Sequence, residues 1–404
     1  MFELGQLFEP VPDPRRAGYR QKYRLCDVLM LCLCAVLSGA NSFTEIAWYG
    51  RLYRDLLVER LGLQFGDSTP SHDTLGRLFS LLDGAALIAC FEAWMAHLHQ
   101  VTQGEQGEVV ALDGKTVCGS FDSATGGKAL HLVSAFACEA RVVLGLEEAT
   151  SVGQEVEAMR ALLSRLELRG RTVTMDAAGT EPQMAALIVS RQGDYLLALK
   201  ANHRHLQEDV AAFFAWLDKM ERRSGAAEAA GLAWQETRHS EGGHGRVESR
   251  RVRAVSVECL REFVTPTLAQ WPHLQSVIMV ERQRKSRVRG QDHRTVTRAY
   301  YLSSLPARHS ADAQRLGQAI RAHWGIENGA HWILDVVWSE DASRVRKDQA
   351  PKNLALVRRL ATNIMRQDTT YNISLSLKRK TAAWNTDFLL QKLVGYHSPS
   401  LVTS

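Results

Sequence analysis

Hydrophobic residues recur at helical spacing through the first hundred residues of the chain. The pattern predicts helices over 25–37, 43–60, 72–82 and 84–101. Between two of them, residues 67–74 combine a proline with Ser, Thr and Asp, which indicates a turn and a helix cap. The most apolar segment, 25–37, has about 13 residues and contains Asp27, so it is too short to span a bilayer. We therefore expect an all-helical domain over residues 1–103 and no membrane partner.

Beyond residue 104 the pattern changes to short apolar runs that alternate with helical segments. Strands are predicted over 108–113, 130–137, 141–147, 171–176 and 194–200, and helices over 153–168, 181–191 and 203–220. This order, β-β-β-α-β-α-β-α, predicts an α/β fold with a mixed sheet and surrounding helices over 104–220. Two of the strands end in an acid, Asp113 and Asp176. Ligand sites of α/β proteins form at such strand ends, so both carboxylates are candidate site residues.

Residues 221–309 interrupt that order with a polar linker and further strands. Alternation predicts strands over 245–257, 275–282 and 294–303. Between the last two, residues 282–289 hold five basic residues in eight. We interpret this region as a β-rich insertion with a basic hairpin tip, from which Arg284, Lys285 and Arg287 would reach DNA. The alternative is a charged hairpin that is only solvated.

Glu327 lies in a segment that is rich in His and Trp and has a helical pattern. The expected helix start is marked by Pro306, a capping Ser310 and Asp312. If the helix is regular, His323, Glu327 and His331 form one polar row, because residues four apart share a face. The alternative is an amphipathic core helix whose His and Glu side chains simply face water.

Two glycines in this segment, Gly325 and Gly329, each cost a helix about 1 kcal/mol relative to alanine, so we expect another group to be pressed against them. A final helix is predicted with Pro351 in its first turn. Its predicted apolar face excludes Arg358, Arg359 and Arg366. These segments complete the core over 310–366, and the polar, weakly patterned residues 367–404 are expected to form a tail.

Composition narrows the class of protein less than the pattern does. The chain is 45% hydrophobic and 23% charged, and its net charge is only +5, as in many globular proteins. Seven scattered cysteines without a Cys-x-x-Cys pair exclude a zinc ribbon and favour reduced thiols in a cytosol. Residues 1–12 do not resemble a signal peptide. Basic residues gather in 13–24, which is compatible with DNA binding or with a merely solvated arm.

The three acids suggest metal chemistry. Carboxylates at Asp113, Asp176 and Glu327 are hard oxygen ligands of the kind that suit Mg²⁺ or Mn²⁺. Two such ions about 3.5–4 Å apart can activate an attacking hydroxyl and stabilise the leaving oxygen in phosphoryl transfer. Other sites are excluded: the glycine that a nucleotide-binding loop requires is Val109, and neither a His-Glu-x-x-His helix nor a Gly-x-Ser-x-Gly elbow is present.

Five segments together resemble DDE-type bacterial insertion-sequence transposases, in the branch that includes the H-repeat-associated proteins. They are 112–116 (Leu-Asp-Gly-Lys-Thr), 131–137 (His-Leu-Val-Ser-Ala-Phe-Ala), 193–200 (Gly-Asp-Tyr-Leu-Leu-Ala-Leu-Lys), 243–250 (Gly-His-Gly-Arg-Val-Glu-Ser-Arg) and 323–328 (His-Trp-Gly-Ile-Glu-Asn). The resemblance runs from about residue 5 to 366. It implies an RNase H-like mixed-sheet catalytic core with the insertion between the second and third acids. By position, Asp113, Asp176 and Glu327 match the catalytic triad of the family. Departures from the family pattern are Cys118, Glu181, Ala201, His323 and Leu334.

The resemblance and the residues together imply a transposase that cuts the ends of its element and joins them to target DNA with Mg²⁺ (or Mn²⁺). The partners would be double-stranded DNA and further copies of the chain, as a homodimer or higher oligomer on DNA, in the cytoplasm of a bacterium and associated with the nucleoid. The residues expected to contact DNA phosphates near the cut are Lys115, His323, Asn328, Arg344, Arg346 and Lys347. The rival hypothesis is a non-catalytic or domesticated DNA-binding relative that keeps the fold.

Overall fold

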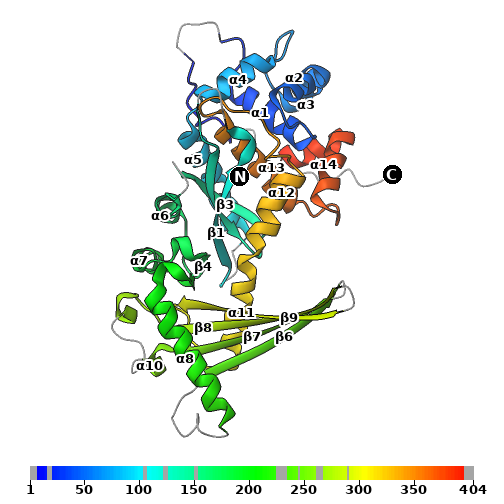
Figure 1. The fold of residues 1–404 in the computed structure, drawn as a ribbon. Coiled ribbons are helices and arrows are strands. Elements are labelled where there is room, and N and C mark those ends of the chain that lie inside the picture. Colours follow the sequence, from blue (N-terminus) through cyan, green and yellow to red (C-terminus); the bar gives the residue numbers. More distant parts are fainter. Residues whose placement is uncertain are drawn as a thin grey trace.

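The computed structural model describes residues 7–15, 21–102, 107–121, 126–149, 153–223, 234–243, 246–260, 267–288 and 291–394. These residues form a helical region, a central mixed sheet and a projecting part of that same sheet (Figure 1). The strand order is β3-β2-β1-β4-β5-β9-β8-β7-β6. The predicted mixed α/β architecture is therefore confirmed.

The first five strands make the part of the sheet that carries the candidate site. They are β1 (Val109–Val117), β2 (Leu130–Ala137), β3 (Val142–Ala149), β4 (Thr172–Met175) and β5 (Asp194–Leu199). β2 is antiparallel to β1 and β3, whereas β4 is parallel to both β1 and β5. The helical elements of this part are η2 (Cys118–Ser120), α6 (Glu155–Arg165), η3 (Ala177–Gly179), α7 (Pro182–Ser190), η4 (Ala201–His203) and α8 (Arg204–Arg222). Parallel strands joined through helices place their carboxyl ends at one sheet edge.

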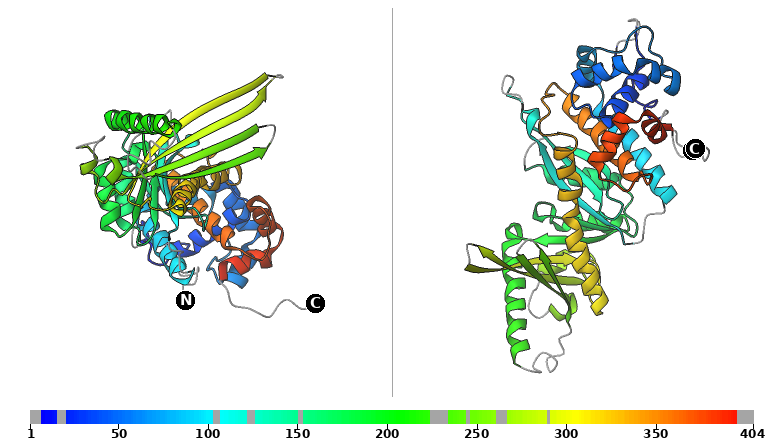
Figure 2. Two further views of the ribbon diagram at one scale, coloured as in Figure 1. Left: turned by 90° about the horizontal axis from the view of Figure 1, so that it is seen from below. Right: turned by 90° about the vertical axis from the view of Figure 1, so that its right-hand side faces the viewer.

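The insertion continues the core sheet instead of forming a sheet of its own. Its strands are β6 (Trp234–Gly243), β7 (Arg246–Ser256), β8 (Ser276–Val288) and β9 (Gln291–Ser303), with α10 (Val257–Leu260) and η5 (Thr267–Gln270) between β7 and β8. β9 pairs antiparallel with β5, and the free ends of the strands project away from the body (Figure 2). Strand β6 was not predicted, because its polar sequence has no apolar alternation to reveal it. The predicted basic tip lies mostly within β8, and residues 289–290 lie outside the described residues.

A buried arginine fixes helix α8 onto this projecting sheet. Arg253 of β7 is fully buried, and its Nη1 lies 2.7 Å from Asp218 Oδ1 on α8. Arg298 of β9 lies 2.7 Å from the other oxygen of the same carboxylate. Because a buried charge is stable only when it is paired, the network favours one orientation of α8 on the strands.

The helical region is α1 (Leu25–Leu37), α2 (Phe43–Leu52), α3 (Arg54–Leu61), α4 (His72–Leu81) and α5 (Gly84–Thr102). The single helix predicted over 43–60 is wrong, because the chain breaks at Tyr53 between α2 and α3. No single helix of the described residues is long and apolar enough to cross a membrane, although the bent pair His72–Leu81 and Gly84–His97 together has the length and composition.

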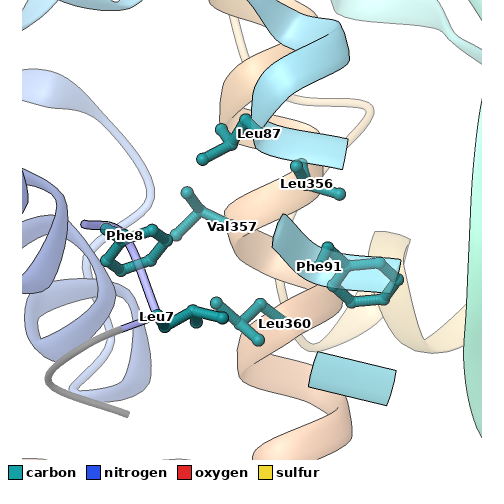
Figure 3. A pocket seen from close by; sticks show the side chains of 7 residues that line it. All are labelled: Leu7, Phe8, Leu87, Phe91, Leu356, Val357 and Leu360. Carbon is teal, nitrogen blue, oxygen red and sulfur yellow. The ribbon is translucent and has the colours of Figure 1, made fainter. Parts of the chain in front are cut away.

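Helix α13 (Ala350–Gln367) joins the helical region to the sheet. Asn353 donates to Phe79 O and Leu82 O, and the same helix packs against β3. Further along α13, Leu7 and Phe8 pack onto this helix and α5 in an apolar pocket (Figure 3). Arg358 and Arg359, predicted to lie off the apolar face of α13, are nevertheless buried, because this helix is covered on nearly all sides. One apolar core runs through the helical region, α13 and the sheet. Because separate cores do not mark the predicted domain boundaries, these boundaries stay a prediction.

The expected tail from residue 367 contains two helices, α14 (Leu375–Trp384) and α15 (Thr386–Val394). Ser374 caps α14 by accepting from Leu377 N, and Phe388 and Leu393 of α15 are buried. The prediction of a tail is therefore wrong up to residue 394. Short helices are stabilised mainly by packing on an existing core, so a few apolar residues are enough and the sequence pattern stays weak. Residues 395–404 lie outside the described residues.

Candidate active site

Asp113 and Asp176 lie side by side at the point where β1 and β4 stop pairing, although β1 itself continues with β2 to Val117. The last pair in the β1–β4 register is Leu112 with Met175, so the next residues on each strand are the two acids. Neighbouring strands lie about 4.8 Å apart, and residues opposite each other point to the same face. The prediction that the two acids are neighbours on the sheet is supported, and Asp176 directly follows β4. The prediction that Asp113 ends its strand is wrong, because β1 continues to Val117 by pairing with β2.

Glu327 approaches these acids from a helical segment made of α11 (Ser310–His323), η6 (Glu327–His331) and α12 (Trp332–Val336). The cap of α11 is His309 with Asp312 and not Ser310 as predicted. The element η6 is a π-helical turn in which Trp332 N donates to Glu327 O, five residues back. A π turn inserts one residue into the α-helical repeat, so the predicted regular row from His323 to His331 is wrong.

The glycines of this segment explain how the turn fits on the sheet. A Cβ on Gly329 would lie 2.8 Å from Cζ of Phe136 on β2, so only glycine lets the turn reach the ring. Arg366 donates to Gly329 O and lies over the same ring, 5.4 Å from its centroid. The expectation of a group pressed against the glycines is confirmed for Gly329. At Gly325 the contacts are ordinary, since an added Cβ would lie 3.8 Å from the Sγ of Cys138.

The three acids share one electrostatic environment. The pKa of Asp113 is raised to about 6, chiefly by burial and further by the negative charges of Asp176, Glu327 and Glu155. A hydrogen bond from Gly114 N to Asp113 Oδ1 opposes this shift. Mutual repulsion among carboxylates is what a bound cation relieves, so the donor set fits a hard divalent ion.

The histidine nearest to Asp113 does not provide the compensating charge. His331 Nδ1 lies 3.6 Å from Asp113 Oδ2. The pKa of His331 is lowered to about 3 by burial and by nearby cations, so its imidazole is neutral at neutral pH. Among the described residues, no three His, Cys, Asp or Glu side chains are close enough to enclose a metal ion. The acids therefore form an open arrangement and not a closed ligand set.

The residue after Asp113 is a glycine because His131 and Glu155 lie close to its backbone on the opposite face of β1. A Cβ on Gly114 would lie 2.5 Å from His131 Nε2 and 3.3 Å from Glu155 Cδ. His131 Nδ1 lies 2.8 Å from Thr116 Oγ1, and its Nε2 lies 2.9 Å from Glu155 Oε1. Glu155 is thus a fourth acid near the site that sequence reasoning missed. The only signal was its position in the first turn of a predicted helix, which says nothing about proximity to Asp113.

Lys115 points into an acidic cluster on the same side of β1 as Asp113. Its Nζ lies 2.9 Å from Asp335 Oδ1, 2.8 Å from Asp341 Oδ1 and 3.9 Å from Glu340 Oε2. The side chain is 7% exposed. The structure therefore does not support the predicted phosphate contact of Lys115, because its ammonium is buried and already has carboxylate partners.

The comparisons with known proteins decide the family. A family model described as Transposase DDE domain matches residues 104–364, and one described as DDE_Tnp_1-associated matches residues 6–95. The chain belongs to the DDE transposase family. YncI of Escherichia coli O157:H7 is 34% identical over 388 residues, 95% of this chain and 92% of that protein. The H repeat-associated protein YhhI of Escherichia coli K12 is 31% identical over 401 residues, 97% of this chain and 99% of that protein.

Two weaker matches complete the comparison. YbfQ of Escherichia coli K12, named an inactive transposase, is 37% identical over 84 residues, 19% of this chain and 93% of that protein. A solved piggyBac transposase synaptic complex with hairpin DNA aligns with 99% of this chain and 82% of that chain, at 11% identity and a TM-score of 0.40. That likeness is too low to support an argument about the fold.

Within this transposase-family chain, the remaining predicted contact residues divide into two groups. Beside the acids, His323 Nδ1 lies 3.0 Å from Thr174 Oγ1, and Asn328 is exposed. The exposed residues Arg344, Arg346 and Lys347 follow α12 on a loop that lies against Gly119, whose carbonyl accepts from Arg346 Nε. This group therefore lies just beyond β1, at Gly119, six residues after Asp113.

The second group lies on the projecting strands. Lys285 of β8 pairs with Arg294 of β9, whereas β9 meets β5 from Tyr300 onward. Six residues of strand span about 20 Å, which places Lys285 and its neighbour Arg284 well away from the core sheet. Both side chains are exposed. The side chain of Arg287 lies outside the described side chains.

Proposed function

We propose that the chain is an active DNA transposase in which Asp113, Asp176 and Glu327 hold divalent metal ions. Two observations support the proposal. Asp113 and Asp176 follow the last paired residues of β1 and β4, and the charges of Asp176 and Glu327 add to burial, the main cause, in raising the pKa of Asp113. In this proposal the three carboxylates, one within β1, one directly after β4 and one on a π-helical turn, act together although 63 and 151 residues separate them along the chain. A raised carboxyl pKa beside further carboxylates is a common property of metal-binding and catalytic sites.

We further propose that the sheet is an RNase H-like core. The order β3-β2-β1-β4-β5, with β4 and β5 parallel to β1, supports this assignment. The insertion then lies between the second and third acids and adds its strands to the β5 edge.

The chemistry assigned to the site is phosphoryl transfer. Mg²⁺ or Mn²⁺, when bound, would activate a hydroxyl and stabilise the leaving oxygen at the scissile phosphate. The residues of the chain hold the ions and position the DNA strand: Asp113 and Asp176 from the sheet edge, Glu327 from η6. Cleavage of the element ends by water would come first, followed by attack of the freed 3′ hydroxyl on target DNA. The partners are double-stranded DNA and further copies of this chain on the bacterial nucleoid.

A cleavage assay tests the proposal. Purified chain is mixed with DNA that carries the inverted repeats flanking its reading frame, with Mg²⁺, with Mn²⁺ or with EDTA. We expect metal-dependent nicking by the wild type, none by Asp113→Asn, and unchanged end binding by that variant, because an amide binds a hard cation poorly but hardly alters the surface. The matched control is Asp55→Asn, a change of an exposed acid on α3.

The outcomes separate the proposal from its rival. Binding without cleavage by the wild type at any metal concentration indicates a non-catalytic DNA-binding relative. Full cleavage by Asp113→Asn removes Asp113 from the metal site.

A further inference from the structure

Lys200 directly follows β5, and Asp176 directly follows the neighbouring strand β4. In the β4–β5 register Met175 pairs with Leu197, so Asp176 lies next to Ala198 and Lys200 follows two residues later. Lys200 keeps an extended backbone, with φ −131° and ψ −163°. Because side chains alternate along a strand, Lys200 points to the same face of the sheet as Asp176.

That face is the one on which helix α11 ends. Leu196, on the same face of β5, packs in a cluster with Leu316 and Ile320 of α11. At the end of the helix, His323 is within hydrogen-bond distance of Thr174. The pKa of His323 is lowered by burial first, while the charge of Asp176 opposes this shift and that of Lys200 adds to it. Lys200, His323 and Asp176 therefore surround one point at the sheet edge.

The loop that follows Lys200 is tied to the loop that follows Asp176. Asn202 Nδ2 donates to Ala177 O over 2.6 Å, and His203 Nε2 lies 2.7 Å from Thr180 O. These bonds hold the backbone beneath Lys200 in a fixed place relative to Asp176. Only the four-carbon stem of the lysine remains free to adjust.

Lys115, within β1, and Lys200, directly after β5, differ in the charges that surround them. Lys115 is buried and lies within 3 Å of two carboxylates. Lys200 is exposed, and within the described part of the chain no carboxylate oxygen lies within 4.0 Å of its ammonium. A lysine held at a site edge without an acidic partner has its donors available for an anionic ligand.

We propose that Lys200 binds a backbone phosphate of the DNA strand that enters the site beside Asp176. The inference rests on the proposed function and adds to it a substrate contact that lies on β5, opposite the loop carrying Arg344. A lysine contact to a phosphate positions the strand and carries no base information. Lys200 therefore serves to place the scissile phosphate against the carboxylates for any element-end sequence.

The experiment compares Lys200→Ala, Lys200→Arg and Lys219→Ala, which removes an exposed lysine of α8, each with circular dichroism and a melting curve as folding checks. Binding of element-end DNA is measured across a salt titration. For Lys200→Ala we expect about tenfold weaker binding at low salt and a salt slope smaller by about 0.9, as for one lost phosphate contact. We expect Lys200→Arg to recover most of the affinity and Lys219→Ala to match the wild type.

A second measurement locates the contact. Single phosphates around the cleavage position are replaced by neutral methylphosphonate, one at a time. One replacement should weaken binding by the wild type but leave Lys200→Ala unaffected, because the contact is already lost. An unchanged salt slope in Lys200→Ala, or equal sensitivity of both proteins at every position, overturns the assignment. Because these readouts are binding constants, they decide on Lys200 separately from the metal-dependent cleavage that tests the proposed function.

Discussion

Lys115 and Asp335 form an ion pair of 2.9 Å that joins the strand of Asp113 to the helix that follows Glu327. The same ammonium contacts Asp341, whose carboxylate also accepts from Cys118 N just beyond β1. The two ends of the candidate site are thus connected through one lysine side chain. Lys115 has the position of a residue that sets the distance between Asp113 and Glu327.

We expect Lys115→Met to reduce cleavage far more than DNA binding. The methionine leaves two carboxylates without a partner and loosens the helix that carries Glu327. The free energy of unfolding should fall by about 1–3 kcal/mol, a moderate loss because Asp335 and Asp341 are about a third exposed to water. Urea unfolding and a metal titration of the cleavage rate measure the two effects.

A double-mutant cycle provides the control for Lys115. Asp335→Asn combined with Lys115→Met should cost less than the sum of the single changes, since each already removes the same ion pair. Strict additivity in the cycle would contradict a stabilising ion pair between Lys115 and Asp335. Equal losses of DNA binding and cleavage would indicate that Lys115 contacts a phosphate.

The raised pKa of Asp113 predicts a pH-dependent stability of the metal-free protein. The folded protein holds the proton of Asp113 up to about pH 6, whereas the ordinary pKa of an aspartate is 3.8. Ionisation of Asp113 therefore destabilises the fold as pH rises from about 4 to 6, by about 2–3 kcal/mol in all. Asp113→Asn should stabilise the protein most at pH 8 and by only about a third as much at pH 4.5.

Melting curves at the two pH values, without metal, measure this difference. Addition of Mg²⁺ at pH 8 should raise the melting temperature of the wild type more than that of the variant, because the cation offsets the same repulsion. A variant that is less stable than the wild type at pH 8 would show that Asp113 is held in a favourable ionised state.

Gly114→Ala should destabilise the protein although the residue carries no side chain. The added Cβ would lie 2.5 Å from His131 Nε2, so the ring must leave its place between Thr116 and Glu155. We expect a loss of about 1–3 kcal/mol, the usual cost of overpacking. Gly66→Ala is the control, because a Cβ there has nothing within 4 Å. Equal stability of the two variants in urea would mean that His131 relaxes freely.

The sequence was sufficient to predict the sheet-edge acids but not everything around them. Asp113 and Asp176 each end an apolar run, and parallel strands bring such ends together without further information. Glu155 could not be foreseen, because it reaches Gly114 through pairing of β2 with β1 and the packing of α6. The π turn of Glu327 likewise depends on Phe136, which lies far away in the chain.

The hydropathy pattern of the sequence also did not predict which charged side chains are buried. Arg359 lies on α13 in a position that the apolar pattern excludes, yet it is fully buried because Glu340 accepts from it at 2.8 Å. Lys115 is likewise buried because carboxylates lie beside its ammonium. A hydropathy pattern assigns both side chains to solvent, since it contains no information about an acidic partner more than ten residues away.

The two basic groups predicted to contact DNA should differ in what they control. Arg344 and Lys347 are exposed on the loop that lies against Gly119, close to the end of β1. Their replacement by alanine should depress the cleavage step itself, because strand position at the acids would be lost. Single-turnover cleavage at saturating enzyme measures that step without a contribution from binding.

Arg284 and Lys285 lie about 20 Å along the strands from the core edge, where long side chains reach DNA away from the cut. Replacing both with alanine should weaken binding and lower the salt slope by up to about 1.8, or 0.9 for each contact. Arg284 is expected to contribute the smaller share, because its Nε lies 3.9 Å from Glu248. Cleavage of DNA that is already bound should stay near the wild-type rate. An unchanged affinity across the salt titration would show that the projecting hairpin is only a solvated charged surface, and a slower single-turnover rate would show that it acts on the site.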